Sequence, residues 1–230
     1  MNPALAPCPW GDWAPGTVSF CEARLCEVVR EPANAWSAVA YGVGALWMLR
    51  RPHQPLPAIL AQLLIGVGSF FFHASGTFAG ELVDQTGMYL LSCLLLAYAL
   101  GERNGLTSRR ILGLYVALVC GSVALNLLVR PIGIPLFGVE LAVGLGLQLR
   151  LGGFPAPARY RDLYIGLAVF AVSLVAWVAD ITKVLCDPDQ HVFNGHALWH
   201  VLNAVAIVYL GAFYAAGTRP RSVRSPPTSA

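Results

Sequence analysis

The chain has 230 residues, of which 57% are hydrophobic and only 12% are charged, and its mean hydropathy is +0.62. A soluble domain usually carries about 25% charged residues, so this composition excludes an ordinary soluble protein and favours one whose outer surface faces lipid. The net charge of +3 comes mainly from arginines in short breaks that form no basic face, so nucleic acid is not expected as a partner.

Long apolar runs recur along the chain and are separated by short breaks rich in Arg, Pro and Gly. A transmembrane helix needs about 20 mainly apolar residues. The sequence therefore predicts an all-α, polytopic membrane protein with seven transmembrane helices, at residues 33–49, 56–73, 83–100, 110–129, 134–150, 163–184 and 196–216. Around this transmembrane domain (33–217) we expect an extracytoplasmic N-terminal segment at 1–32 and a disordered cytoplasmic tail at 218–230.

The basic residues predict the orientation of these helices. With the N-terminus outside, the inner segments hold many arginines and the outer segments hold few basic residues. The inner set is Arg50, Arg51, Arg103, Arg109, Arg110, Arg150, Arg159, Arg161, Arg219, Arg221 and Arg224, and the outer set is Arg24, Arg30, Arg130 and Lys183. The positive-inside rule then favours the N-terminus out and the C-terminus in, which requires an odd number of spans. Residues 1–32 lack a continuous apolar core, so we expect the first span to act as the insertion signal.

Few residues capable of chemistry lie within the predicted spans, and they share one depth. Ser69 and His73 lie four apart near the end of the second span, and His196 and His200 lie four apart at the start of the seventh. Asp84 stands at the start of the third. A spacing of four places each pair on one face of its helix. Because the second span runs outward and the other two begin outside, all five residues are expected near the outer side of the bilayer.

Together these residues could cleave an amide. The imidazoles of His73, His196 and His200 can ligate Zn²⁺ and leave a fourth position for water. Zinc lowers the pKa of such a water toward about 7. Asp84 would then serve as general base and return the proton to a leaving amine, while Ser69 would hydrogen-bond the developing oxyanion or orient the water.

Other interpretations of the same residues stay open. One His-x-x-x-His pair is a weak motif, since buried histidines also bridge membrane helices or ligate haem iron. Ser69 could bond its own i−4 carbonyl, and Asp84 could be an acid that favours a helix start through the dipole. Their common depth favours one functional site, because intramembrane ionisable groups are functional by default. We expect His53 and His191, which lie in loops, to have no role.

The motif residues resemble those of the alkaline ceramidases and of the broader membrane hydrolase superfamily that includes the progestin and adipoQ receptors. The shared elements are Gly68-Ser69-Phe70-Phe71-Phe72-His73, then Asp84, then His196-Ala197-Leu198-Trp199-His200. More specifically ceramidase-like are Cys21-Glu22 followed by Asn34-Ala35-Trp36-Ser37, and Trp177-x-x-Asp180 followed by Cys186. The resemblance covers about residues 19–216. It implies a seven-helix fold, a three-histidine zinc site with Asp84 and Ser69 beside it, and hydrolysis of ceramide to a sphingoid base and a fatty acid.

The resemblance also implies calcium, and here the chain departs from the family. Members commonly bind calcium through acidic and amide side chains around the Cys-Glu pair. Glu22 is present, but Ser19, Arg24 and Asn34 stand near positions where other ligands are expected. Calcium needs oxygen ligands, and Arg24 supplies none. We therefore expect Glu22 and Asn34 to mark a vestigial calcium region, with the Arg24 guanidinium partly replacing the lost charge beside Glu22.

Four cysteines fall on the predicted outer side, which is oxidising in a bacterial or secretory setting. We predict a disulfide between Cys21 and Cys186, which would tie the N-terminal segment to the loop before the last span. Cys8 and Cys26 could pair with each other or compete for the same partners. The two remaining cysteines lie inside spans and are expected to be apolar fillers.

Several other polar residues lie in or near the spans. Asp180 and Lys183 could pair on one helix face, although Lys183 could equally reach the interface. Glu140 and Asn126 are expected to join helices through hydrogen bonds. The tryptophans near the outer side fit an aromatic belt: Trp10, Trp13 and Trp36.

Three functions compete on this basis. The leading one is a zinc-dependent lipid amidase acting on ceramide. The alternatives are a related membrane lipid esterase or lipase, and a receptor-like binding protein with a structural zinc, which would normally be closed by four protein ligands. We expect a membrane lipid and the bilayer as partners, with no obligate protein partner. The preference for arginine over lysine suggests a bacterium, which would place the site on the periplasmic side of an inner membrane.

Overall fold

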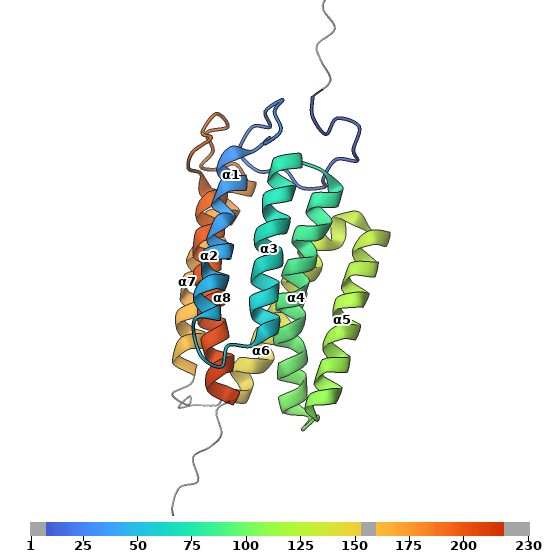
Figure 1. The fold of residues 1–230 in the computed structure, drawn as a ribbon, viewed down its shortest axis with the longest axis vertical. Coiled ribbons are helices and arrows are strands. Elements are labelled where there is room, and N and C mark those ends of the chain that lie inside the picture. The colour runs from blue at the N-terminus through green and yellow to red at the C-terminus, as the bar shows by residue number, and fades with distance from the viewer. Residues whose placement is uncertain (1–7, 153–159, 219–230) are drawn as a thin grey trace, which may run out of the picture.

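The computed structural model describes residues 8–152 and 160–218, and these form a bundle of helices (Figure 1). The helices are α1 (Pro32–Ser37), α2 (Val39–Leu49), α3 (Leu56–Ser75), α4 (Phe78–Arg103), α5 (Ser108–Leu128), a 3₁₀ turn η1 (Arg130–Ile132), α6 (Gly133–Gly152), α7 (Tyr160–Ile181) and α8 (Gly195–Thr218). Within the described ranges the chain has one isolated β-bridge and no strand, which confirms the all-α class. The tail predicted to be disordered lies, from residue 219 on, outside the described residues.

Six of these helices are long and apolar enough to cross a membrane, namely α3, α4, α5, α6 together with η1, α7 and α8. The predicted first span corresponds to α1 and α2, which have 6 and 11 residues and are each too short to span alone. They follow one another along the same side of the bundle (Figure 1). At the junction the Ala38 N–H bonds Ala35 and the Tyr41 N–H bonds Ala38, a tightened i→i+3 pattern. A seventh crossing and the direction of the termini therefore stay predictions.

The α4 helix lies at the centre of one half of the bundle, where α3, α5 and α6 pack against it, while α7 packs against α8. The backbones of α3 and α4 approach closely because glycines face the contact. A Cβ atom on Gly68 would lie 2.5 Å from the amide nitrogen of Asp84, and one on Gly87 would lie 2.6 Å from that of Ile65. Small residues allow this approach in membrane helix pairs. The close contact sets Ser69, next to Gly68, beside Asp84.

Buried polar side chains join the helices on the α5 side, as expected for Glu140 and Asn126. Glu140 accepts hydrogen bonds from Ser92 at 2.6 Å and Ser122 at 2.5 Å, which links α6 to α4 and α5. Asn126 on α5 donates to Gln85 on α4. Such interhelical bonds are worth roughly 0.6 kcal/mol each in membranes, so the cluster serves mainly to fix how the three helices pack.

Residues 8–31, called here the N-terminal strap, cross the bundle end where α3 stops and α4 and α8 begin (Figure 1). Disulfides join Cys8 to Cys26 and Cys21 to Cys186. The strap also pairs with the α3–α4 turn, where the Gly16 N–H donates to the Gly76 carbonyl at 2.9 Å. These links hold the strap over the residues that form the candidate site.

Candidate metal centre and active site

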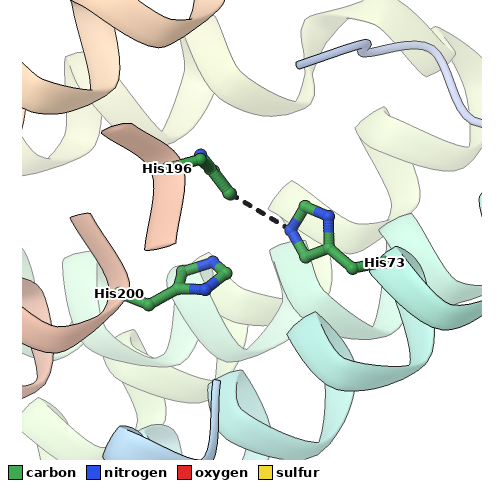
Figure 2. Close-up of side chains that lie close together, drawn as sticks. All are labelled: His73, His196 and His200. Carbon is green, nitrogen blue, oxygen red and sulfur yellow. Dashed lines mark hydrogen bonds between the residues drawn. The ribbon is translucent and has the colours of Figure 1, made fainter. Parts of the chain in front are cut away.

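Three histidines from α3 and α8 converge beneath the strap (Figure 2). All three are buried, and one ring nitrogen of each lies within 4.8 Å of the others. The Nε2 atoms of His73 and His196 are 3.1 Å apart. Two nitrogen ligands of a tetrahedral zinc ion, each about 2.0–2.1 Å from the metal, would be separated by roughly 3.3 Å. The spacing of His73 and His196 and the chemistry of all three rings therefore fit a metal ion.

Hydrogen bonds at the far side of two rings fix which nitrogen faces the centre. The Nδ1 atom of His73 lies 2.6 Å from Glu31 Oε2, and a carboxylate can only accept. The Nδ1 atom of His200 lies 2.8 Å from Ser37 Oγ, whose own proton is donated to the Asn34 carbonyl. Both rings are thus protonated on Nδ1 and present the Nε2 lone pair inward, the arrangement in which histidine binds metals.

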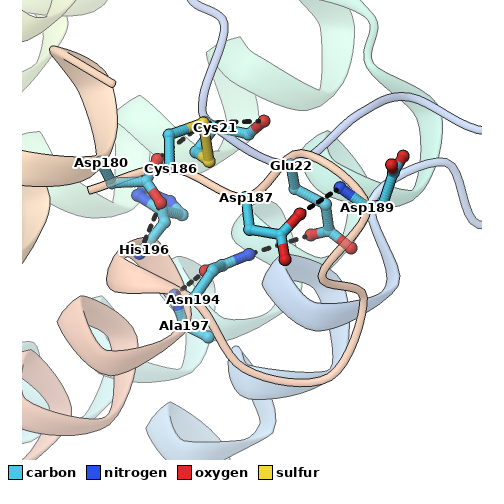
Figure 3. Close-up of a disulfide and its surroundings, with 9 residues drawn as sticks. All are labelled: Cys21, Glu22, Asp180, Cys186, Asp187, Asp189, Asn194, His196 and Ala197. Atoms are coloured by element: carbon cyan, nitrogen blue, oxygen red, sulfur yellow. Dashed lines mark hydrogen bonds between the residues drawn. A yellow bond between two sulfur atoms is a disulfide. The ribbon is translucent and has the colours of Figure 1, made fainter. Parts of the chain in front are cut away.

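His196 is held differently from the other two. Its ring stacks on Phe20 of the strap, with centroids 3.7 Å apart, and its Nδ1 atom is buried without a hydrogen-bond partner among the described residues. Its backbone N–H donates to Asp180 Oδ2 at 3.0 Å, which caps the start of α8 (Figure 3). The start of α8 and the strap therefore position this ring, rather than a bond to its distal nitrogen.

Glu31 was missed in the sequence, and it is the carboxylate that contacts the cluster directly. Burial alone would raise the pKa of Glu31, but the hydrogen bonds and charges of His73 and Arg24 outweigh burial and lower it. Arg24 donates to Glu31 Oε1 at 2.8 Å and to the Val18 carbonyl at 3.0 Å. The expectation that Arg24 would lie beside Glu22 is thus wrong, because Arg24 pairs with Glu31. An acid directly before Pro32, at the depth of the histidines, was the available signal.

Glu22 instead caps the first turn of α1. Its carboxylate accepts from the backbone N–H groups of Ala33 at 2.9 Å and Asn34 at 3.0 Å, an arrangement that the helix dipole favours. His191 lies 2.9 Å from the same carboxylate, a structural contact that the sequence did not predict. The Asn194 side chain is 3.5 Å away. Glu22 thereby ties the loop before α8 to the start of α1 (Figure 3).

Ser69 and Asp84 border the histidines. The Ser69 hydroxyl lies 3.0 Å from His200 Nε2, and Ser69 and Asp84 line the same cavity. Asp84 does not start its helix as predicted, because α4 begins at Phe78 with Thr77 as its N-cap, so the carboxylate lies in the second turn. A role as a helix-start acid is thereby removed. Asp84 keeps partial exposure because it faces an internal cavity.

Asp180 links the strap to α8 through backbone bonds. It accepts from the Cys21 N–H at 2.9 Å as well as from His196, and the neighbouring Cys21–Cys186 disulfide closes the same region, with sulfur atoms 2.07 Å apart (Figure 3). Of the two alternatives for Lys183, the side-chain pair with Asp180 does not form. Among the described residues no ion pair joins the two, and the Lys183 N–H donates to the Asp180 backbone carbonyl.

A cavity of about 360 Å³ opens beside the histidines. Its head carries the polar groups of Ser69, Asp84, His196 and His200, and Phe20 of the strap covers it. The walls are apolar, contributed chiefly by α4, α6, α7 and α8: Met88, Leu91, Phe137, Leu141, Leu145, Phe170, Leu174, Trp177 and Trp199. A smaller cavity of about 50 Å³ shares several of these residues and continues between α6 and α7 toward Leu210. The site is thus a polar head on an apolar tunnel.

The chain is similar to known proteins in two comparisons. A Dictyostelium discoideum protein named "Putative alkaline ceramidase dcd3B" is 24% identical over 180 residues, which cover 67% of this chain and 61% of that protein. The chain thus spans about three fifths of the relative's length, and a eukaryotic relative lends no support to a bacterial inner membrane. The family model described as Ceramidase matches residues 14–143, which include most of the strap, His73, Ser69 and Asp84. Since that match covers more than half of the 230 residues, the chain belongs to the ceramidase family.

Proposed function

We propose that the protein is a zinc-dependent membrane amidase that hydrolyses the N-acyl bond of ceramide to a sphingoid base and a fatty acid. The observation that carries the proposal is the buried three-histidine cluster, with Ser69 and Asp84 beside it, at the head of an apolar cavity. Membership of the ceramidase family and the name of the Dictyostelium relative support ceramide as the substrate class.

His73, His196 and His200 would hold the metal through ring nitrogens, and the described residues offer no fourth histidine, cysteine or carboxylate within the cluster. A site with three protein ligands leaves a position for water, as catalytic zinc sites do, whereas structural sites are closed. When bound, Zn²⁺ supplies a Lewis acid for the substrate carbonyl and lowers the pKa of its water toward about 7.

Asp84 would transfer the proton, and Ser69 would stabilise the negative charge that develops. The Asp84 carboxylate accepts the proton of the attacking water and delivers it to the amide nitrogen as the C–N bond breaks, so the sphingoid base leaves as a neutral amine. The Ser69 hydroxyl, which lies 3.0 Å from His200 Nε2 and lines the same cavity as Asp84, donates to the oxyanion that develops on the acyl carbonyl. Gly68 supports this arrangement by bringing α3 against the backbone of Asp84.

The apolar tunnel would hold hydrocarbon chains while the amide lies at its polar head. Its walls come from α6 and α7, which pack on α4 and α8 respectively. A two-chain lipid could therefore reach the site laterally from the bilayer, between α6 and α7. This route is consistent with a site that lies at one end of the bundle, beneath the strap (Figure 1).

Calcium binding is not part of the proposed function. Both carboxylate oxygens of Glu22 accept backbone N–H groups, and those of Glu31 accept Arg24 and His73. Asn34 donates its side-chain amide N–H to Glu31 and its backbone N–H to Glu22. The acidic groups of this region are thus satisfied within the protein, with Arg24 supplying the positive charge.

We propose the N-terminus out and the C-terminus in, with the site on the outer, periplasmic side of a bacterial inner membrane. The arginine distribution and the two disulfides on the strap side of the bundle support this placement. A cysteine-accessibility scan of loop residues in intact cells would establish which end of the bundle faces out.

One experiment tests the central proposal. The protein is purified in detergent, bound metal is quantified by mass spectrometry, and hydrolysis is assayed with ceramide and with a matched ester lipid. We expect one zinc per chain and ceramide cleavage, with both lost in His196→Ala and both kept in His53→Ala, whose imidazole is exposed in a loop. Zinc without ceramide turnover would mean either that the substrate is an ester lipid or that the protein binds a lipid without cleaving it. If the purified protein contains no zinc, the proposed zinc-dependent mechanism is wrong.

A further inference from the structure

A second, larger hollow runs along one side of the bundle, over α2 and α8, from Val201 beside His200 to the opposite end. It has a volume of about 910 Å³ and is bounded by α2, the start of α7 and one face of α8 from Val201 to Ala216. This volume falls within the range of roughly 300–1,000 Å³ typical of small-molecule sites. The hollow shares no residue with the catalytic cavity, so it calls for its own explanation.

Most of the groove is apolar and built for a chain-like ligand. Small residues form its floor, which leaves room between α2 and α8: Ala40, Gly44, Ala204 and Ala212. Large apolar side chains stand exposed around it, including Val43 at 62%, Trp47 at 52% and Val201 at 43%. A hydrocarbon chain lying on this floor would contact all of these side chains.

The inner end of the groove is polar and carries both signs of charge. Arg51 comes from the turn after α2, with its guanidinium 4.6 Å above the Trp47 ring, and Asp162 comes from the first turn of α7. Gln54 lines the same end, and its side-chain carbonyl oxygen is buried without a donor among the described residues. The end therefore offers a cation for an anionic group and acceptors for an N–H donor.

From this arrangement we infer that the groove binds a glycerophospholipid with an ethanolamine headgroup. The lipid phosphate pairs with Arg51, the ammonium group donates to Asp162, and an acyl chain lies along the small-residue floor. A choline headgroup has no N–H donor and would leave the acceptors unsatisfied, and a glycerol headgroup carries no positive charge for Asp162. The site is independent of the proposed amidase reaction.

Native mass spectrometry of the purified protein tests this inference. Dioleoyl phosphatidylethanolamine, phosphatidylcholine and phosphatidylglycerol are titrated separately, and the fraction of chain carrying one lipid is measured. We expect the ethanolamine lipid to bind about tenfold more tightly than the choline lipid, as one charge-assisted hydrogen bond would provide. Asp162→Asn should abolish this preference, and Arg51→Gln should weaken both lipids about tenfold.

Arg110→Gln is the matched control, because Arg110 is an exposed arginine at the start of α5, outside the groove. It should bind all three lipids like the wild type. Ala212→Phe fills the floor and should reduce binding of every lipid, and thermal melts establish that each variant is folded. Equal binding of the three lipids, binding unaltered by both charge variants, or a dimer that seats a second copy in the groove would each overturn the inference.

Discussion

The Glu31 carboxylate lies 2.6 Å from the Nδ1 atom of His73, while the Nε2 atom of the same imidazole points at His196. The carboxylate thus holds the ring in the tautomer whose Nε2 lone pair faces the cluster. Arg24 holds the other oxygen of Glu31 at 2.8 Å and also bonds the Val18 carbonyl. A chain of three charged or polar groups therefore connects the N-terminal strap to the proposed metal ligand.

The first prediction concerns the series of contacts from Arg24 through Glu31 to His73. Glu31→Gln keeps the shape of the side chain but removes the charge that fixes the His73 tautomer, so we expect zinc affinity to fall by about 10–100-fold. Arg24→Gln should give a smaller loss, because Glu31 would keep its bond to His73. Affinity is measured by competition with a chromogenic chelator, with Glu27→Gln, an exposed acid of the same strap, as control. Unchanged affinity in Glu31→Gln would show that the ring is oriented by packing alone.

Asp84→Asn separates proton transfer from metal binding. The amide cannot accept the water proton, so we expect kcat for ceramide hydrolysis to fall by about 10²–10⁴. Because Asp84 is not among the clustered ligand atoms, the zinc content should stay at one per chain. The measurement pairs a fatty-acid release assay with metal analysis of the same sample. Loss of zinc in Asp84→Asn would instead assign this carboxylate a structural role at the metal.

The clustered residues could be found from sequence because two of the contacts are local. His196 and His200 share a helix face at a spacing of four, as do Ser69 and His73. Apolar run lengths then placed these faces at one depth, and the structure brings the three histidines together. The helix boundaries were less accurate, because α4 extends five residues before the predicted start at 83 and its first turn contains Gly80 and Glu81, which interrupt the apolar run.

The partners of Glu31, Glu22 and Asp180 could not be predicted from local patterns. Each is set by how the strap crosses the bundle, through contacts between segments far apart in sequence, such as Cys21 with Asp180 and Glu22 with His191. The disulfide between Cys21 and Cys186 could be predicted because the predicted topology places both cysteines on the same side of the membrane. The break at Ala38, which divides the first predicted span, has no proline or glycine to announce it.

A calcium titration tests whether Arg24 has removed the need for that ion. In the wild type we expect no rise in melting temperature on adding 1 mM CaCl₂, whereas a site with a Kd of about 10 μM would add about 2.7 kcal/mol. Arg24→Asn frees one Glu31 oxygen and adds an amide oxygen, so a calcium-dependent rise is expected in that variant alone. A rise in the wild type would show that the acidic residues still bind calcium.

The contact between α3 and α4 gives the last prediction. A methyl group on Gly68 would lie 2.5 Å from the Asp84 nitrogen and 2.6 Å from its Cα, so Gly68→Ala must push the two backbones apart. Overpacking of this kind costs about 1–3 kcal/mol, and it displaces Asp84 from Ser69. We expect a lower melting temperature in detergent and reduced ceramide hydrolysis, with zinc retained, since none of the three histidines is on α4 and two of them are on α8.

Gly121→Ala is the matched control for this change. Gly121 lies in the middle of α5 and a Cβ atom there would meet nothing within 4 Å, so alanine should leave activity unchanged and melting equal or slightly higher. If both alanine variants behave like the wild type, then α3 and α4 can separate without cost, and the position of Asp84 must depend on the strap bonds at Glu81 and Thr17 instead.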